Sequence, residues 1–192
     1  NRTAIGTVHF HENSRLASIG NSAFSGSNLL LSMTIPAGVT TIGANAYQNA
    51  TLGTLSFESG SQLTSIGNAA FAGCETMTYL TLPTGLESIG YDVFSGCIEL
   101  MSVAIPDSVT SIGGNAFAGC TNLTIYTEYT NPPAGWIGGW NSLNRPIVLG
   151  CTLSDDGAIV SFTKTDSNPF NANATGGVMN PSRSGYSFGG WY

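Results

Sequence analysis

The chain has 192 residues, and only 8% of them are charged, with 11 acidic against 5 basic residues and a net charge of −6. Nucleic acid is not an expected partner, because binding to phosphates needs clustered Lys and Arg. No apolar run approaches the roughly 20 residues that a membrane-spanning helix requires. The polar positions are filled mainly by Ser, Thr, Asn and Gly, which favours an extended extracellular protein over a cytosolic enzyme.

From its start to about residue 123 the chain repeats one signature. An Ile-Gly pair returns at intervals of 23, 24, 23 and 23 residues, at Ile19-Gly20, Ile42-Gly43, Ile66-Gly67, Ile89-Gly90 and Ile112-Gly113. Four residues after each Ile comes a small apolar residue and then an aromatic one, at Ala23-Phe24, Ala46-Tyr47, Ala70-Phe71, Val93-Phe94 and Ala116-Phe117. A period in this range predicts a solenoid in which each repeat forms one coil.

The repeat that begins at Cys97 shows how a coil is built. Its apolar positions Leu100, Val103 and Ile105 are spaced as in a strand with one buried face. Val109 and Ile112 follow where the chain turns, and they supply a second set of inward groups. One coil cannot bury both sets alone. The coils must therefore stack, with their strands paired in parallel about 4.7–4.9 Å apart.

The coils differ in length at one corner. The bends over residues 10–16 and 57–63 are each two residues longer than the bend over residues 35–39. Variation confined to one corner predicts a loop on the outside of the coil. A Pro directly after the strand removes a backbone donor and ends strand pairing in three coils, at Pro36, Pro83 and Pro106.

The recurring phrase Ile-Pro-x-x-Val-x-x-Ile-Gly-x-x-Ala-Phe-x-x-Cys-x-x-Leu resembles the BspA-like leucine-rich repeats of bacterial surface proteins, over roughly residues 1–125. The chain departs from it at Tyr47, where Phe is usual, and at Ser27 and Ala50, where Cys is usual. The resemblance implies a right-handed leucine-rich repeat solenoid, mostly β with short turns or 3-10 segments and a parallel concave sheet. We assign about five to six coils to residues 1–123. The resemblance also implies a secreted or surface-attached bacterial interaction protein, with adhesion as its role and no catalysis.

Three of the four cysteines, Cys74, Cys97 and Cys120, share one repeat position and are expected to form a column directed into the stack. They are either buried thiols, acting as small hydrophobes and weak donors, or they include a Cys97–Cys120 disulfide. The disulfide is possible because neighbouring coils bring Cα atoms within the roughly 4.4–6.8 Å that it spans. Cys151 lies outside the column and is either free or paired. Zinc is not expected, because no C-x-x-C motif is present.

The repeats end near Leu123, and residues 124–150 are expected to cap the solenoid by covering the apolar layer of its last coil. Two interpretations remain open for Trp136 and Trp140. The tryptophans either pack over the final repeat, or their flat faces, beside several glycines, stack on sugar rings as a carbohydrate platform.

Residues 151–192 change character again and read as a linker followed by a partial β segment. Their last twelve residues, 181–192, are similar to the Pro-x-Arg-x-Gly-Tyr-x-Phe-x-Gly-Trp-Tyr signature of internalin-type B-repeats, small β-grasp-like modules of bacterial surface proteins. We expect the native protein to extend past Tyr192. Since the chain begins at Asn1 with no signal-like segment, we also expect a processed or truncated piece.

No catalytic residue, metal site or cofactor is expected. The two histidines, His9 and His11, lie beside Glu12, but a metal site there would need a third ligand at the right distance. The serines lack a G-x-S-x-G motif and have no further His to act as a general base. We therefore do not expect an enzyme.

The residues that alternate with the inward strand positions should point outwards from the concave sheet. From them we select as candidate partner-binding residues His9, Thr34, Ser56, Tyr79, Thr81 and Ser102, together with Trp136 and Trp140 in the cap. Six strands of about three exposed residues give a sheet face of roughly 250–300 Å². A specific protein interface buries on the order of 800 Å² per partner. Binding is therefore expected to be weak, to use the loops and cap, or to depend on many copies.

Three functions remain open. The first is adhesion or protein binding at the bacterial cell surface or outside the cell, with host or bacterial surface proteins, including extracellular matrix proteins, as partners. The second is a structural spacer that presents other domains. The third is binding of glycans through Trp136 and Trp140. We expect the chain to be a monomer.

Overall fold

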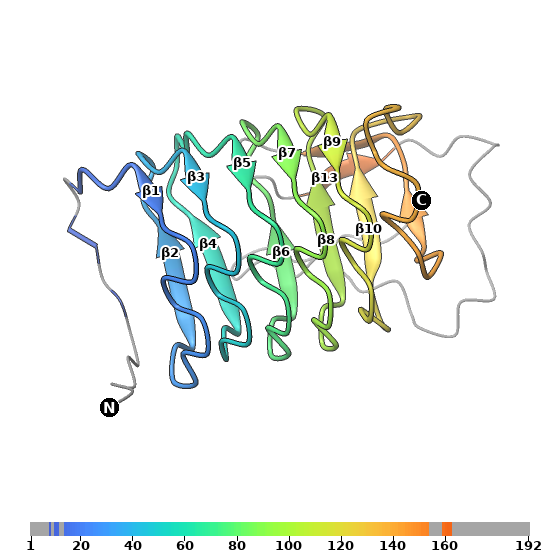
Figure 1. Cartoon of the computed structure of the whole chain (residues 1–192). Helices are drawn as coiled ribbons and strands as arrows, with labels where there is room; N and C mark the ends of the chain where they lie inside the picture. Colours follow the sequence, from blue (N-terminus) through green and yellow to red (C-terminus); the bar gives the residue numbers. More distant parts are fainter. Residues whose placement is uncertain (1–7, 9, 12–13, 154–158, 163–192) are drawn as a thin grey trace.

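The computed structural model describes residues 8, 10, 11, 14–153 and 159–162. In this part the chain forms thirteen strands and no helix, and its coils stack side by side along one axis (Figure 1). The strands of the coils pair in parallel with those of neighbouring coils. This arrangement confirms the predicted leucine-rich repeat solenoid. The apolar side chains of successive coils form one continuous core between the strands.

The Ile-Gly segments form a parallel sheet of their own. Its five two-residue strands lie in the order β1 (Ser18–Ile19), β3 (Thr41–Ile42), β5 (Ser65–Ile66), β7 (Ser88–Ile89) and β9 (Ser111–Ile112). In each strand the Ile is buried and the Ser or Thr before it is partly or fully exposed. The sequence predicts only a turn with inward groups here. A sheet forms because the backbones of adjoining coils come close enough to hydrogen-bond, as Gly43 N does to Ile19 O at 2.8 Å.

The longer strands form the predicted parallel face, in two hydrogen-bonded pieces. One piece pairs β2 (Ser32–Ile35) with β4 (Thr54–Phe57), and the other has the order β6 (Tyr79–Thr81), β8 (Ser102–Ile105), β10 (Thr124–Thr127) and β11 (Ile147–Val148). The interruption falls where the coil length changes. Ala50 and Leu52 are one residue closer than their equivalents in other coils, and the bend over residues 57–63 is two residues longer.

A column of aromatic rings runs along the interior. Phe24, Tyr47, Phe71, Phe94 and Phe117 stack nearly parallel, with centroids 5.1 to 5.6 Å apart. Four of the rings are almost completely buried, and Phe24, in the first of these coils, is partly buried. Aromatic side chains bury large areas, so this column supplies much of the apolar surface that holds the coils together.

In every Ile-Gly pair after the first, close backbone approach requires the glycine. A Cβ atom at Gly113 would lie 2.5 Å from Tyr91 N and 2.6 Å from Gly90 C, and one at Gly67 would lie 2.7 Å from Ala44 N. Gly20 differs, since a Cβ atom there would meet nothing within 4 Å. The glycine thus marks the place where one coil rests on the preceding one.

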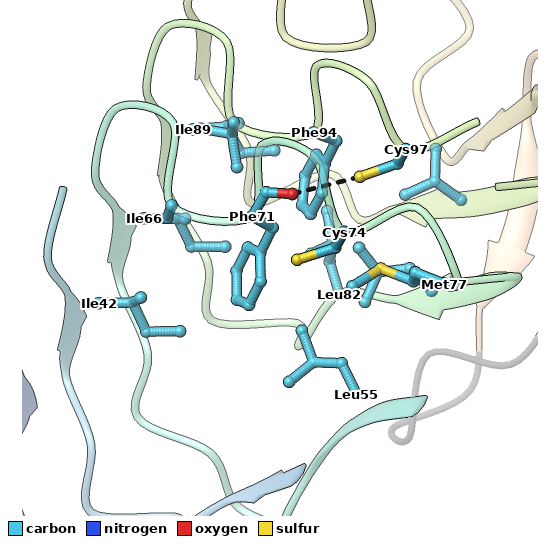
Figure 2. Packing of buried hydrophobic residues seen from close by; sticks show 14 of the residues in the cluster. Ile42, Leu55, Ile66, Phe71, Cys74, Met77, Leu82, Ile89, Phe94 and Cys97 are labelled. Carbon is cyan, nitrogen blue, oxygen red and sulfur yellow. Dashed lines mark hydrogen bonds between the residues drawn. The ribbon is translucent and has the colours of Figure 1, made fainter. Parts of the chain in front are cut away.

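The cysteine column is a ladder of buried free thiols, as in the first of the two sequence interpretations. Each thiol donates to the backbone carbonyl of the aromatic residue one coil earlier. Cys74 Sγ lies 3.2 Å from Tyr47 O, Cys97 Sγ 3.3 Å from Phe71 O and Cys120 Sγ 3.1 Å from Phe94 O. Figure 2 shows the Cys97 thiol directed at the Phe71 carbonyl. The Cys97–Cys120 disulfide, the second interpretation, is not formed.

The segment predicted as a cap, residues 124–150, follows the path of one more coil. β10 and β11 extend the sheet of long strands, and Trp136 takes the place of the repeat Ile by forming a parallel bridge with Ile112. Trp140 ends the aromatic column, with its ring edge-on to Phe117 at 77° and a centroid distance of 6.2 Å. The apolar end of the stack is therefore covered by a coil that has lost the repeat signature.

After this coil, β12 (Cys151–Leu153) pairs antiparallel with β13 (Ile159–Phe162). Glu128 joins this hairpin to the solenoid, because its carboxylate accepts hydrogen bonds from Leu153 N and from Asp107 N, both at 3.1 Å. Glu58 holds the equivalent position three coils nearer the start of the coil series and accepts one from Ala37 N at 2.9 Å. The B-repeat-like ending at residues 181–192 lies outside the described residues.

Candidate partner-binding face

The outward side chains of the long strands form two rows. In the registers of β2 with β4 and of β6, β8 and β10, the first row holds Ser32, Thr54, Tyr79, Ser102 and Thr124, and the second holds Thr34, Ser56, Thr81, Ala104 and Tyr126. Repeat alignment joins the two pieces of each row across the interruption after β4. Four of the sequence-selected residues, Thr34, Ser56, Tyr79 and Thr81, lie on neighbouring strands of this face, and Ser102 follows on β8.

The part of the face on β2 and β4 is the most open. Ser32, Thr34, Thr54 and Ser56 are all exposed. Thr34 Oγ1 and Ser56 Oγ share a hydrogen bond of 2.9 Å. Within the described part of the chain, Ser32 and Thr54 make no side-chain hydrogen bond. Since a hydroxyl both donates and accepts, these groups can satisfy a polar ligand of either kind.

Tyr79 is the largest exposed side chain on the face. It is 50% exposed, while Leu80 beside it is buried and anchors β6 in the core. Its hydroxyl donates to Met101 Sδ at 3.6 Å, so the side chain reaches towards the residue before β8. The ring is thereby held in one direction while half of its surface remains in contact with water.

The C-terminal part of the face is less open. Ala104 is only 5% exposed although it belongs to an outward row, and Thr81 and Ser102 are half-buried. Burial raises the pKa of the Tyr126 hydroxyl, and the nearby Cys151 thiol adds to the rise. β12, the first strand of the terminal hairpin, contacts β10 at this end of the face.

Both tryptophans selected from the sequence lie in the last coil, and neither belongs to the two rows of outward side chains on the long strands. Trp136 is 6% exposed, and its indole Nε1 donates to Val109 O at 2.9 Å. Trp140 is half-buried, and the two indole rings meet at 73° with centroids 4.7 Å apart. The rings do not form a shared flat platform, and the faces of Trp136 are occupied by the protein. His9 lies outside the described residues.

The alternation of residues along the strands does not predict some of the exposed apolar side chains. Leu29 and Leu31 are 50% and 66% exposed, beside the buried Leu30, and Tyr91 is 49% exposed in a turn. The repeat alignment could have predicted the exposure of the two leucines, since only Leu30 falls on an inward position.

A shallow hollow at the shortened coil is lined by Asn49, Ala50, Thr51, Gly73, Glu75 and Thr76.

The ionisable groups near the core are held in their neutral forms. Burial raises the pKa of Cys74 to about 12 and those of Cys120 and Cys151 to about 11. Among the described residues, no group of three or more His, Cys, Asp or Glu side chains is placed to hold a metal ion. That part of the chain also has no helix long and apolar enough to span a membrane.

A comparison with known families identifies the repeats. Residues 2–124 match the family model described as "BspA type Leucine rich repeat region" in six copies. A comparison with curated protein sequences gives no significant match.

Several solved structures resemble the chain. A leucine-rich repeat protein of T. pallidum is 33% identical with a TM-score of 0.55, and the match covers 58% of this chain and 52% of that one. A leucine-rich repeat protein of Bacteroides ovatus is 26% identical with a TM-score of 0.47, covering 57% and 34%. A leucine-rich cell surface protein of Faecalibacterium prausnitzii is 26% identical with a TM-score of 0.36, covering 65% and 45%. The match thus spans about half of the length of the T. pallidum protein and less than half of the length of the other two proteins.

Proposed function

The chain belongs to the BspA-type leucine-rich repeat family, and from this premise we propose that it is a secreted or cell-surface interaction module of a bacterium, acting in adhesion. The observation that carries the proposal is the open part of the sheet face. Its outward side chains, from Ser32 on β2 to Tyr79 on β6, are exposed to solvent. The low content of charged residues supports an extracellular location.

The scaffold suits recognition because it is stiffened from inside. The buried aromatic column and the thiol ladder fix the coils relative to one another, so the outward side chains keep their positions, with about 4.8 Å between hydrogen-bonded strands. A rigid surface loses little conformational entropy on binding. The proposal assigns the chain no catalytic role.

The size of the face sets the expected strength of binding. Even the whole sheet offers roughly 250–300 Å², against about 800 Å² per partner for a standard specific interface. Binding by one copy is expected to be weak, and adhesion would then draw on the flanking loops or on many copies at one surface.

A spacer that presents other domains is the second candidate. The observation that favours it is the composition of the surface on β2 and β4. The four outward side chains there are all Ser or Thr, and none is an aromatic or Arg residue of the kind that anchors interfaces. The extended stack of coils in Figure 1 would serve this role without any ligand.

The two candidates are separated by binding of the purified chain to epithelial cells and extracellular matrix proteins. In the Thr34→Lys/Ser56→Lys variant, two long charged side chains stand on the open face, and binding should be lost. The matched control, Thr40→Lys/Thr64→Lys, changes exposed residues beside the short strands and should bind like the unmodified chain. Equal binding by both variants would remove the sheet face from the proposal, and no binding to any surface would favour the spacer.

A further inference from the structure

We infer that the open part of the sheet face recognises an uncharged glycan, with the Tyr79 ring as the stacking surface and the neighbouring hydroxyls as hydrogen-bonding partners. We call this the hydroxyl face and define it as the exposed residues Ser32, Thr34, Thr54, Ser56 and Tyr79, with the half-buried Thr81 at its edge. The inference rests on the proposed function and names the chemistry that this surface would recognise.

Charge is the first argument. All six residues of the hydroxyl face are uncharged, on three strands. The carboxylate nearest in sequence, that of Glu58 after β4, is already engaged with Ala37 N. A charged ligand would lose hydration here without gaining a countercharge, which is unfavourable. A neutral polyol meets no such penalty.

The second argument is the pairing of an aromatic face with hydroxyls. A pyranose ring presents C–H groups on its faces and hydroxyls around its edge. Tyr79 offers a half-exposed ring whose hydroxyl is held by Met101, and Thr54 occupies the same row one coil earlier. The hydroxyls can donate or accept, as sugar hydroxyls do.

Spacing and area point the same way. The hydrogen-bonded strands β2 and β4 lie about 4.8 Å apart, close to the width of a sugar ring, so two successive rings of a chain could lie over them. Three strands with about three residues each expose roughly 140 Å². This area is far below the approximately 800 Å² that a protein partner needs, but it suits a few sugar rings.

This site differs from the one that the tryptophans suggest in the sequence. The indole of Trp136 is buried and donates its N–H to Val109 O. Tyr79 keeps half of its surface free. The glycan therefore belongs on the long-strand face and not on the last coil.

The test is titration of the full chain with neutral trisaccharides, namely β-linked trimers of glucose, of mannose and of N-acetylglucosamine, followed by NMR or calorimetry. For any trimer that binds, Tyr79→Ala should weaken affinity about tenfold through loss of ring stacking. Tyr79→Phe should retain most of the affinity. Tyr91→Ala, which removes an equally exposed tyrosine in a turn, is the matched control and should change nothing. Binding by none of the trimers, or equal loss in the Tyr79→Ala and Tyr91→Ala variants, would overturn the inference.

A second arm keeps this inference separate from the proposed function. Binding of the chain to epithelial cells is measured before and after enzymatic removal of their glycans. Cell binding that survives both glycan removal and Tyr79→Ala would overturn the glycan inference and leave the adhesion proposal standing. Trimer binding without any cell binding would support the site and contradict adhesion. Loss of cell binding on glycan removal supports both.

Discussion

At the scale of single residues, the signature positions have different physical reasons although they look alike in the sequence. Gly113 and Gly67 are glycines because a Cβ atom would collide with the backbone of the preceding coil, whereas Gly20 has open space around it. Tyr47 fills a position of the aromatic column that elsewhere holds Phe, and its buried hydroxyl has no hydrogen-bond partner among the residues that the structure describes.

The glycine contrast gives the first prediction. Gly113→Ala should lower the free energy of unfolding by about 1–3 kcal/mol, because the added methyl forces the two coils apart. Gly20→Ala should leave it unchanged or raise it by about 0.4–1 kcal/mol through the lower entropy of the unfolded chain. Urea unfolding followed by circular dichroism measures both. Equal losses at the two positions would show that close approach is not the reason for the glycine.

Tyr47 gives the second prediction. Burial raises the pKa of its hydroxyl, and the Cys74 thiol nearby adds to the rise. Tyr47→Phe removes an unsatisfied polar group and should raise the free energy of unfolding by about 1–3 kcal/mol. The reverse change one coil later, Phe71→Tyr, is the matched control and should lower it. Thermal unfolding of the two variants decides, and a destabilised Tyr47→Phe would mean that its hydroxyl has a partner in solution.

At the scale of elements, each structural column repeats one contact per coil. The thiol ladder is one example, in which every cysteine donates to the aromatic carbonyl of the preceding coil. The last coil shows how far such a column tolerates change. Trp140 still closes the aromatic column there, although Trp136 and Ile137 take the positions of the repeat Ile and Gly.

The ladder predicts how stability depends on pH. Burial raises the pKa of Cys74 from 9.0 to about 12 and that of Cys120 to about 11, so the native state favours the protonated thiols. Their contribution is fully present below the unfolded-state pKa near 9 and is lost as pH rises through about 11 to 12. Urea midpoints between pH 8 and 11 should therefore fall.

The control for this prediction is the Cys74→Ala/Cys120→Ala variant. It should be less stable at pH 8 but show a shallower fall in its urea midpoint as pH rises. An identical fall in both proteins would assign the pH dependence to other groups.

At the scale of the whole molecule, stability is close to a sum over coils and the contacts between neighbours, so the ends matter most. Trp136 covers the C-terminal end, where it contacts Tyr129 and Trp140 and bonds to Val109 O.

Trp136→Ala should therefore cost about 3–5 kcal/mol and open the stack from its C-terminal end. Hydrogen exchange is the measurement, and amides of β9 and β10 should lose protection before those of β3 and β5. Ile137→Ala, at the 43% exposed neighbouring residue, is the control and should change little. Uniform loss of protection along the chain would contradict unfolding from one end.

The sequence alone determined the coil, its period and its core. Each repeat carries its own inward residues, such as Val103 and Ile105, and each coil packs only on its neighbours, so the local pattern and the fold coincide. The sequence also placed Thr34, Ser56 and Tyr79 on one face, because alternation in a strand fixes the direction of each side chain.

Tertiary structure decided how the backbones meet and which outward residues stay open. Whether β4 pairs with β6 depends on how two coils of different length are positioned relative to each other. The sheet of short strands depends on the separation between coils at Gly43 and Gly67. The burial of Ala104 and Trp136 likewise depends on side chains from other coils. A repeat pattern specifies each coil's own residues, but exposure is a property of the assembled stack, and for that reason only the structure separates the occupied Trp136 from the half-open Tyr79.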